Sequence, residues 1–443
     1  MNNKYKLIIW SISAALGGFL FGFDTAVISG VEQTLQNLWQ STTLEHGLTV
    51  SIALIGTVLG SLIGGYPTER LGRRSSLFIV AVLYVISALG SAYAIDWVTF
   101  LIFRLLGGLG VGISSVVAPM YISEIAPPSK RGRLVALFQF NVVFGILMAY
   151  LSNYIIGDIL GMNWRWMLGI EAIPALVFLF LILGIPESPR WLILNRNLVS
   201  KAKETLSIID PQNAENTIQG ILSSGKSQSE KNSFKDIFNE DYRKPLLLAV
   251  LFAVFNQTSG INAIIYYAPR IFEMAGLGSS IALLSSAGIG LVNLIFTLVG
   301  LLLIDRFGRR FLMTVGSLGL ILTLLLVAFS FLQQNTAGYS VPIYLFLFMA
   351  FFAMSQGAVI WVFISEIFPN RVRANGQALG SFTHWLLAAL ISFSFPYFAE
   401  TFGGATTFGF FALMMVLQLL FVRKLMPETR GTALENLEPI SIK

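Results

Sequence analysis

Three ionisable residues stand inside stretches that are otherwise almost wholly apolar. They are Asp24 in "GGFLFGFDTAVISG", Arg104 in "TFLIFRLLGG" and Glu171 in "LGIEAIPA". In a bilayer an ionised side chain costs at least about 2.5–3.5 kcal/mol, and it usually faces the protein interior and pairs there. A carboxylate that exchanges an arginine partner for a proton loses its charge and lets the surrounding helices rearrange. These residue types indicate a proton-coupling site; the alternative is a static ion pair, which seldom repays its desolvation.

Uncharged polar and aromatic residues form a second set that is able to bind a ligand. A small polar ligand is bound by several fixed polar groups and flat apolar surfaces. The stretch "FNQTSGINAIIYY" supplies Asn256, Gln257 and Asn262, and its Gly260 is able to break a helix. Interhelical hydrogen bonding and plain packing are the alternative roles. Other apolar stretches supply further candidate ligand-binding residues: Gln139, Asn293, Trp361, His384 and Trp385. The candidate gating or pocket aromatics are Phe21, Tyr266 and Tyr267.

The composition of the chain places these residues in a membrane protein. Of the 443 residues 55% are hydrophobic and only 12% are charged, whereas soluble domains are about a quarter charged. There is no cysteine and there are only two histidines, so we expect no metal centre, no cofactor and no enzymatic nucleophile. The formal net charge of +6 comes from basic residues in short loops between apolar runs. This pattern is typical of a cytoplasmic membrane face and not of nucleic-acid binding.

Twelve apolar segments are long enough to cross a bilayer as helices, which need about 17–25 residues. The first has no cleavage site before it and is expected to be retained. The sequence thus predicts an all-α membrane protein whose one long polar segment, residues 187–244, forms short amphipathic helices around "KAKETLSIID" and "GKSQSEKNSFKDIF". The predicted spans are residues 7–30, 47–67, 76–94, 99–121, 134–156, 166–185, 245–269, 281–304, 311–332, 342–365, 377–398 and 406–422.

Lysine and arginine predict how these spans are oriented. They gather in alternate loops together with the two termini, so both termini are expected in the cytoplasm. With this orientation Asp24, Arg104 and Glu171 lie about 8–9 Å from the outer ends of three spans, from the 1.5 Å rise per helical residue. The three groups are therefore expected to share one depth, where Asp24 pairs with Arg104 and Glu171 competes for the same guanidinium.

Three motifs recur in the same order in the two halves of the chain. The first motif, "ERLGRR", recurs 236 residues later as "DRFGRR". The second, "YISEIAP", recurs 242 residues later as "FISEIFP", and the third, "PESPRW", recurs 241 residues later as "PETRG". A repeat of this length indicates two six-helix halves related by duplication. The expected division is a first bundle at residues 1–186, a cytoplasmic helical linker at 187–244, a second bundle at 245–425 and a cytoplasmic tail at 426–443.

Together with "QTSGIN", these motifs on twelve spans resemble the sugar porter family of the major facilitator superfamily. That family includes the bacterial xylose–proton symporter and the mammalian facilitative glucose transporters. The resemblance implies two domains that rock about a central site. It implies that Gln139, Gln257, Asn262, Asn293 and Trp361 bind sugar, that Trp385 lines the pocket, and that Asp24 occupies the proton-carrying position of the symporters.

The chain also departs from the family in ways that leave its substrate open. Asn256 stands where both named relatives have glutamine, and His384 stands where a glucose or xylose porter typically has an amide. Ile146 replaces a glutamine of the xylose symporter and agrees with the glucose porters. Glucose, galactose, xylose and fructose therefore all remain possible substrates.

Charged residues at the predicted cytoplasmic span ends form a third candidate set. Arginine–carboxylate pairs there are expected to act as a latch that holds the outward-open state and breaks on inward opening; the alternative is that they only set the topology. The predicted members are Glu69, Arg73, Arg74, Glu124, Arg131, Glu187, Arg190, Asp305, Arg309, Arg310, Glu366, Arg373 and Glu428.

These observations lead to one expected function and two alternatives. The expected protein is a proton-coupled symporter that imports a monosaccharide by alternating access, in a bacterial inner or plasma membrane. Its partners would be the sugar, the proton and the lipid bilayer, with no nucleic acid, and it would work as a monomer. A facilitative uniporter of the same fold and a non-transporting membrane sugar sensor are the alternatives.

Overall fold

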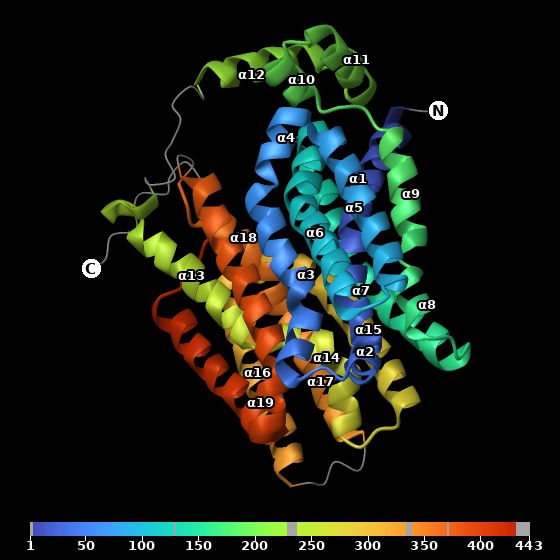
Figure 1. The fold of residues 1–443 in the computed structure, drawn as a ribbon. Helices are drawn as coiled ribbons and strands as arrows, with labels where there is room; N and C mark the ends of the chain where they lie inside the picture. Colours follow the sequence, from blue (N-terminus) through green and yellow to red (C-terminus); the bar gives the residue numbers. More distant parts are fainter. Residues whose placement is uncertain (1–2, 128–129, 228–236, 334–338, 370–371, 431–443) are drawn as a thin grey trace. The chain divides into compact units, whose positions relative to one another are not determined.

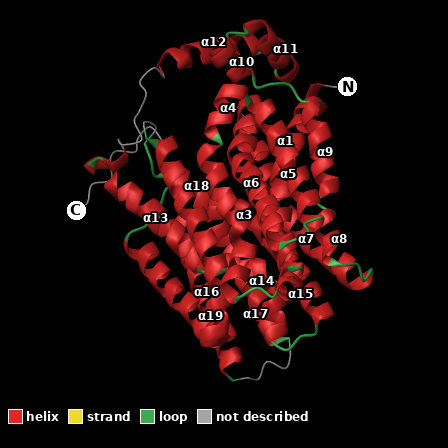
Figure 2. Ribbon diagram, in the orientation of Figure 1, coloured by secondary structure: helices red, strands yellow, loops and turns green. Residues whose placement is uncertain are grey.

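The computed structural model describes residues 3–127, 130–227, 237–333, 339–369 and 372–430. Within these ranges all regular structure is helical (Figure 2). The chain divides into two compact units. Figure 1 labels their helices. Unit 1 comprises Met1–Thr25, Ile55–Ile146 and Arg165–Lys231, and unit 2 comprises Ala26–Leu54, Leu147–Trp164 and Asn232–Lys443.

Unit 1 is built from the first long helices and a small helical cluster. Its helices are α1 (Asn3–Val27), the second part of α3 (Thr43–Ile63), α4 (Gly65–Leu71), α5 (Arg73–Ala92), α6 (Trp97–Ile125), most of α7 (Arg131–Asn153), α8 (Trp164–Gly169), α9 (Ala172–Leu183), α10 (Pro189–Arg196), α11 (Val199–Ile209) and α12 (Ala214–Ser227).

Unit 2 contains the remaining long helices. They are α2 (Glu32–Trp39), α13 (Arg243–Thr258), α14 (Ile261–Met274), α15 (Ser279–Phe307), α16 (Arg309–Leu332), α17 (Ser340–Phe352), α18 (Ala358–Glu366) and α19 (Arg373–Lys424). Short 3-10 turns lie at Ile28–Gly30 and Glu240–Tyr242, and π-helical turns at Tyr154–Ile159 and Ala353–Gly357.

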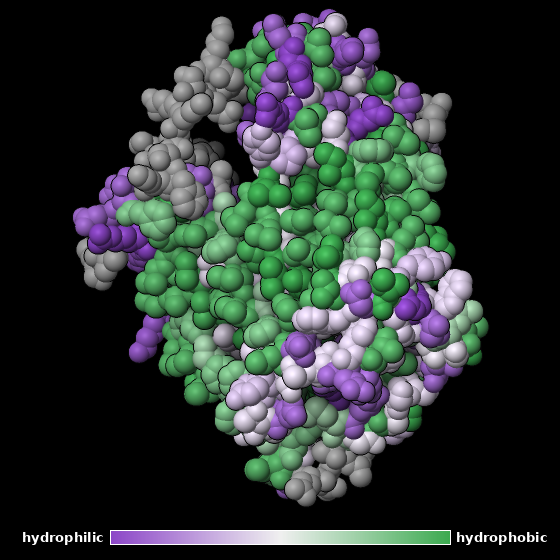
Figure 3. Space-filling model, viewed as in Figure 1, coloured by the Kyte–Doolittle hydropathy of each residue, from purple (hydrophilic) through white to green (hydrophobic). Residues whose placement is uncertain are grey.

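Eleven helical segments of the described chain are long and apolar enough to span a membrane. The last of them, Asn375–Lys424, is interrupted at Gly403 (φ 75°, ψ 165°), so it accounts for two predicted spans. Large apolar side chains point outward from these helices: Phe180 is 69% exposed and Leu302 is 77% exposed. Figure 3 shows this apolar surface on the long helices and a hydrophilic surface over α10–α12. The chain is therefore a multi-span membrane protein.

Glycine brings α3 and α6 into backbone contact within unit 1. A Cβ atom on Gly56 would lie 2.4 Å from the carbonyl oxygen of Leu105, and one on Gly60 would lie 2.4 Å from that of Leu109. Small residues allow this close approach, which replaces the hydrophobic driving force that is absent in lipid. The packing fixes α6 and hence the position of Arg104.

Gly260 interrupts the seventh predicted span, as the sequence analysis expected. Its φ of +84° is readily available only to glycine, and it separates α13 from α14. A second kink follows at Tyr267 (φ −122°, ψ 21°), two residues before Pro269, which lacks a backbone N–H donor. The polar residues of this segment therefore lie at a break in the helix.

The segment between the predicted halves is only partly as expected. "KAKETLSIID" falls in α11 as predicted, but most of "GKSQSEKNSFKDIF" lies outside the described residues. The sequence analysis missed α10, which begins where Ser188 caps the backbone N–H of Trp191, and it missed α12. All three helices bury one face in a common core, which includes Trp191, Leu206 and Ile218.

Candidate functional site

A buried ion pair between Asp24 and Arg104 lies inside unit 1. Arg104 Nη1 of α6 donates to Asp24 Oδ1 of α1 at 2.5 Å, and Nη2 donates to the Asp24 backbone carbonyl at 3.0 Å. Each residue is only 1% exposed. Gly107, one turn further along α6, lets α5 pack closely there, since a Cβ atom on it would lie 2.3 Å from Ser87 Oγ. The two charges that the sequence predicted to pair thus contact each other directly.

Glu171 lies in the same buried region without an ion-pair partner in the described structure. It stands between α8 and α9, where Pro174 cannot donate to the Ile170 carbonyl, and the N–H of Ile173 bonds that oxygen instead. Its carboxylate interacts electrostatically with Asp24 and Arg104. Glu171 Oε1 and Arg104 Nε are both buried and have no hydrogen-bond partner among the described residues. A spare acceptor and a spare donor are therefore available for a different pairing.

Gln257 is the centre of a polar cluster in unit 2. Its side-chain nitrogen donates to Asn256 Oδ1 at 3.0 Å and lies 3.1 and 3.2 Å from the two ring nitrogens of His384. Its side-chain oxygen accepts from Asn262 Nδ2 at 2.7 Å across the Gly260 break. Asn256 Nδ2 is buried with no hydrogen-bond partner among the described residues. The structure thus brings four of the predicted sugar-binding residues together.

Two tryptophans lie beside this cluster. The ring centroid of His384 is 4.8 Å from that of Trp361 on α18 and 4.8 Å from that of Trp385 on α19, and the two tryptophans are 6.2 Å apart. Aromatic rings of this kind offer flat apolar faces next to polar groups. Amides and aromatic faces, the two requirements for holding a sugar, therefore occur in one place.

Other predicted ligands lie apart from this cluster or in unit 1. Asn293 of α15 accepts from Thr297 Oγ1 at 3.3 Å, a contact within its own helix. Gln139 of α7 and Phe21 of α1 are half-buried residues of unit 1.

The two tyrosines predicted to gate the site are buried within unit 2. Tyr267 Oη donates to the Ser392 carbonyl of α19 at 2.9 Å, and Tyr266 is 1% exposed. Both tyrosines thus pack inside the unit in this state.

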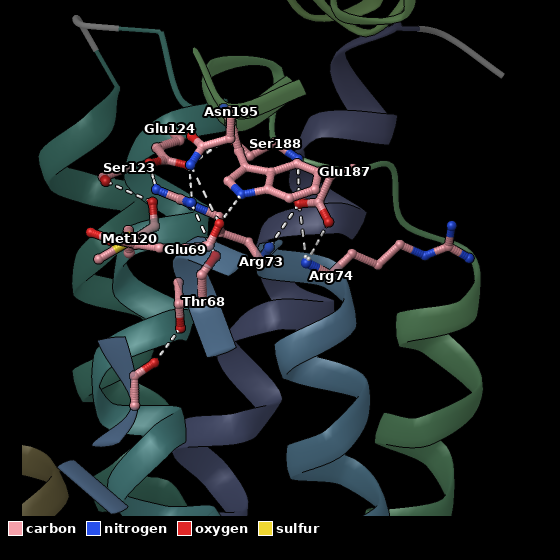
Figure 4. A network of polar contacts seen from close by, with 12 residues as sticks. Thr68, Glu69, Arg73, Arg74, Met120, Ser123, Glu124, Glu187, Ser188 and Asn195 are labelled. Carbon is pink, nitrogen blue, oxygen red and sulfur yellow. Dashed lines mark hydrogen bonds and ion pairs between the residues drawn. The ribbon is translucent and has the colours of Figure 1, made fainter. Parts of the chain in front are cut away.

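The repeated motifs build the same charge network twice. Figure 4 shows the first copy, around Arg73 and Glu124. Arg73 binds both oxygens of Glu124, at 2.9 and 2.8 Å, and Arg309 binds both oxygens of Glu366, at 3.0 and 2.8 Å. Such two-point arginine–carboxylate contacts are among the stronger polar pairs. Ser188 donates to Glu124 at 2.5 Å, and Thr429 donates to Glu366 at 2.6 Å. The contacts of Ser188 and Thr429 were not predicted from the sequence, although each residue follows the glutamate of a repeated "PE" motif.

Glu187 and Glu428 cap the helices that begin with the paired arginines. Glu187 accepts from the backbone N–H groups of Arg73 and Arg74, and Glu428 accepts from those of Arg309 and Arg310. Burial raises the pKa of Glu187, and its backbone hydrogen bonds offset this only in part. Glu428 is more exposed; burial raises its pKa, but four backbone N–H groups outweigh this and hold the pKa below its usual value.

The structure corrects the expectation for Arg74 and Arg310. Their guanidinium groups bind backbone carbonyls at the ends of other helices, Leu183 at 2.6 Å for Arg74 and Val422 at 3.2 Å for Arg310, and not carboxylates. Free carbonyls at a helix C-terminus attract cations, which explains this choice. These two arginines therefore cap helices.

Other predicted latch residues also lack the expected pairing or have only weak contacts. Arg131 binds the Ser123 carbonyl at 3.1 Å, Arg373 binds the Phe368 carbonyl at 3.2 Å, and the Glu69 backbone carbonyl accepts from Trp191 at 2.6 Å. Asp305 lies 3.4 Å from Arg309, but its side chain is 82% exposed, so this pair contributes little. The Arg190 side chain is half-buried, and no polar contact of it is found among the described residues.

Alanine at Gly72 or Gly308 is expected to lower the melting temperature of the protein. Both glycines have φ/ψ values, 99°/168° and 87°/166°, that are essentially restricted to glycine and cost another residue about 1–3 kcal/mol. A new Cβ atom would also lie 2.3 Å from Glu187 Oε2 or 2.6 Å from Glu428 Oε2. Gly65→Ala in α4 is the control, because a Cβ atom on Gly65 would have no described atom within 4 Å beyond its chain neighbours and the backbone of its own helix. Equal melting of Gly72→Ala and Gly65→Ala in detergent would contradict this account.

The chain is similar to known transport proteins over nearly its whole length. The family model described as "Sugar (and other) transporter" matches residues 10–440. The arabinose-proton symporter of Bacillus subtilis (strain 168) is 37% identical over 446 residues, covering 99% of this chain and 95% of that protein. The D-xylose-proton symporter of Escherichia coli (strain K12) is 37% identical over 482 residues, covering 99% and 97%.

Solved structures give the same result. The partially occluded inward open conformation of the xylose transporter XylE from E. coli aligns with a TM-score of 0.85 at 35% identity, covering 97% of this chain and all of that one. The fold and the relatives are thus those of membrane transporters and not of enzymes. The chain belongs to the sugar transporter family, and its twelve-helix major facilitator fold confirms the predicted class.

Proposed function

We propose that this protein is a proton-coupled symporter that imports a monosaccharide by alternating access. The observation that carries the proposal is the buried Asp24–Arg104 pair with Glu171 beside it. The relatives named as xylose–proton and arabinose–proton symporters support a pentose as the first substrate to test. The relative named as a glucose transporter, from Staphylococcus epidermidis, is 35% identical and supports testing hexoses as substrates too.

The chemistry at Asp24 would couple the proton to the conformational change. When a proton binds to the Asp24 carboxylate, the attraction to Arg104 is lost and the guanidinium is released. Arg104 then turns to Glu171, whose unpaired Oε1 offers the nearest compensating charge. Release of the proton on the other side restores the first pairing. The two pairings define two states between which the ligands shift the population.

The sugar would bind beside Gln257, where Asn256, Asn262 and His384 offer polar atoms and Trp361 offers an apolar face. Gln139, Asn293 and Trp385 are proposed as further contacts from other helices, with Phe21, Tyr266 and Tyr267 as gating aromatics. The Arg73–Glu124 and Arg309–Glu366 pairs would stabilise the cytoplasmic span ends in one state and break in the other. Function as a monomer, without nucleic acid, is part of the same proposal.

The proposed topology places both termini in the cytoplasm and divides the chain into bundles at residues 1–186 and 245–425. The absence of cysteine makes this testable by single-cysteine labelling. Ile95, 85% exposed in the loop before α6, is expected to react from outside after substitution by cysteine. Gln212, exposed between α11 and α12, is expected to react only after the membrane is made permeable. Labelling in the reverse pattern would contradict the orientation.

His384 is expected to determine selectivity more than affinity. It presents an imidazole to Gln257, whose one donor and one acceptor lie at separate ring nitrogens, whereas an amide would offer two donor hydrogens and a carbonyl acceptor from one terminal group. His384→Asn and His384→Gln should therefore change the order of affinity for xylose, arabinose, glucose and fructose, as measured by thermal stabilisation. An unchanged order in both variants would assign His384 to helix packing.

Uptake of labelled xylose, arabinose and glucose into proteoliposomes tests the function as a whole. A symporter accumulates sugar above the external concentration only under an inward proton gradient. Equilibration without accumulation would identify a uniporter, and binding without uptake would identify a sensor. Each of these two results would overturn the proposal.

A further inference from the structure

A second group of buried charges, away from Asp24, lies within unit 2. Arg270 Nε of α14 donates to Glu32 Oε1 of α2 at 2.9 Å. Arg270 Nη2 forms an ion pair with Glu32 Oε2, also at 2.9 Å. His46 of α3 places Nε2 2.6 Å from the same Oε2. The side chains of Glu32 and His46 are fully buried, and that of Arg270 is 21% exposed. Arg270 also binds Gln36 Oε1.

This Glu32–His46–Arg270 cluster joins segments far apart in the sequence. Glu32 and His46 belong to the first predicted six-helix half, whereas Arg270 belongs to the second. Neighbouring hydrogen bonds join the same two parts of the chain: Gln33 to Glu273 at 2.7 Å, Thr43 to Glu400 at 2.6 Å and Tyr150 to the Ile265 carbonyl at 2.6 Å. The cluster is the buried charged centre of these contacts, which lie at the predicted outer ends of the spans.

Both described polar contacts of the His46 ring are made by Nε2. This nitrogen lies 2.6 Å from Glu32 Oε2, an oxygen that has no hydrogen-bond partner among the described residues. The longer 3.4 Å approach of Arg270 Nη2 to the same nitrogen is the weaker contact. His46 Nδ1 is buried and has no hydrogen-bond partner among the described residues. With a single proton on the ring the imidazole is neutral, so the cluster contains one carboxylate and one guanidinium and is electrically neutral.

A second proton on the His46 ring would add a second positive charge next to Arg270. The other titratable groups nearby do not balance it. Tyr267 of α14 faces the imidazole edge-on at a ring distance of 6.1 Å and donates its hydroxyl to Ser392. Glu45 of α3 binds Thr42, and Glu400 of α19 and Glu273 of α14 bind the partners given above. The protonated cluster would therefore hold excess buried positive charge and an unsatisfied N–H donor, both of which are costly.

We propose that His46 is a second proton-binding site, and that its protonation releases Arg270 from Glu32. This inference rests on the proposed function. Arg270 lies beyond the kink at Tyr267, on the helix that begins after Gly260 and carries Asn262. Releasing it would free the outer end of α14 to move about these two breaks. Acid on the sugar-entry side would then open the path to the site, in addition to protonating Asp24.

The test uses spin labels on two exposed residues, Leu38 of α2 and Met274 of α14, each replaced by cysteine in the cysteine-free chain. Distances are measured on the full-length protein from about pH 5 to pH 8, the range in which histidine titrates. All samples carry Asp24→Asn, which removes the other proton site. We expect a longer-distance population to grow severalfold on acidification, and His46→Gln to abolish this growth and retain the short distance.

A second variant separates titration from loss of packing. Glu32→Gln removes the carboxylate that attracts both cations, so the longer distance should dominate at every pH. Sugar exchange in proteoliposomes should follow the same order, fast for Glu32→Gln and insensitive to pH for His46→Gln. A pH response that survives His46→Gln, or no pH response with His46 present, would overturn the inference. Failure of the proposed function would appear separately, as absence of uphill transport by the unmodified protein.

Discussion

Proteoliposomes that contain the Asp24→Asn variant are expected to exchange labelled for unlabelled sugar but not to accumulate it under a proton gradient. The substitution removes the charge and keeps nearly the same volume, so it imitates the protonated aspartic acid permanently. Arg104 loses its 2.5 Å ion pair and is free to approach Glu171. The loaded carrier still changes conformation, but it has no proton to release, so accumulation should fall to the level found without a gradient.

Asp96→Asn is the matched control for this experiment. Asp96 lies outside the spans and caps α6 by accepting from the Thr99 backbone N–H at 2.8 Å. Asparagine caps helices about as well as aspartate, so this variant should accumulate sugar normally. If Asp24→Asn also accumulates sugar as the unmodified protein does, the Asp24–Arg104 pair is structural and Asp24 does not carry the proton.

Replacing Gln257 or Trp361 by alanine is expected to weaken sugar binding by about 1–3 kcal/mol, the cost of a lost polar partner or stacking face. This corresponds to about a 5- to 150-fold rise in the dissociation constant. Gln257 should have the larger effect, because its amide contacts Asn256, Asn262 and His384 and its loss leaves all three without that partner. Titration of the purified variants with each monosaccharide measures the change.

Gln418→Ala provides the comparison for loss of a buried amide. Gln418 of α19 donates to Ser317 at 2.8 Å and is 1% exposed, but it makes no described contact with the Gln257 cluster. Its loss should lower thermal stability and leave sugar affinity unchanged. Equal affinities for Gln257→Ala, Trp361→Ala and the unmodified protein would place the sugar site elsewhere.

The Asp24–Arg104 pair could be predicted from the sequence because a charged side chain inside a membrane span has few stable environments. A buried charge in a span must find a partner at its own depth, and helical rise gives that depth from residue counts alone. The break at Gly260 could be predicted for a similar reason, since glycine among polar residues marks a site where a helix can end. In both cases one strong local constraint determines the result.

The exact hydrogen-bond partners could not be predicted. Whether Arg74 contacts Glu187 or the Leu183 carbonyl depends on where α9 ends, and sequence patterns give helix ends only to within a few residues. The short helices α10 and α12 were missed because each is amphipathic only over a few turns. No role for His46 was predicted, because its partners Glu32 and Arg270 come together only when distant helices pack.

The most direct test of proton coupling is to follow the proton itself. Unmodified protein in proteoliposomes, with equal pH on both sides and a pH-sensitive dye outside, receives a pulse of xylose, arabinose or glucose. We predict that the transported sugar makes the external solution more alkaline as protons enter with it, and that Asp24→Asn abolishes this signal while Asp96→Asn keeps it. Sugar entry with no proton movement in the unmodified protein would contradict the account.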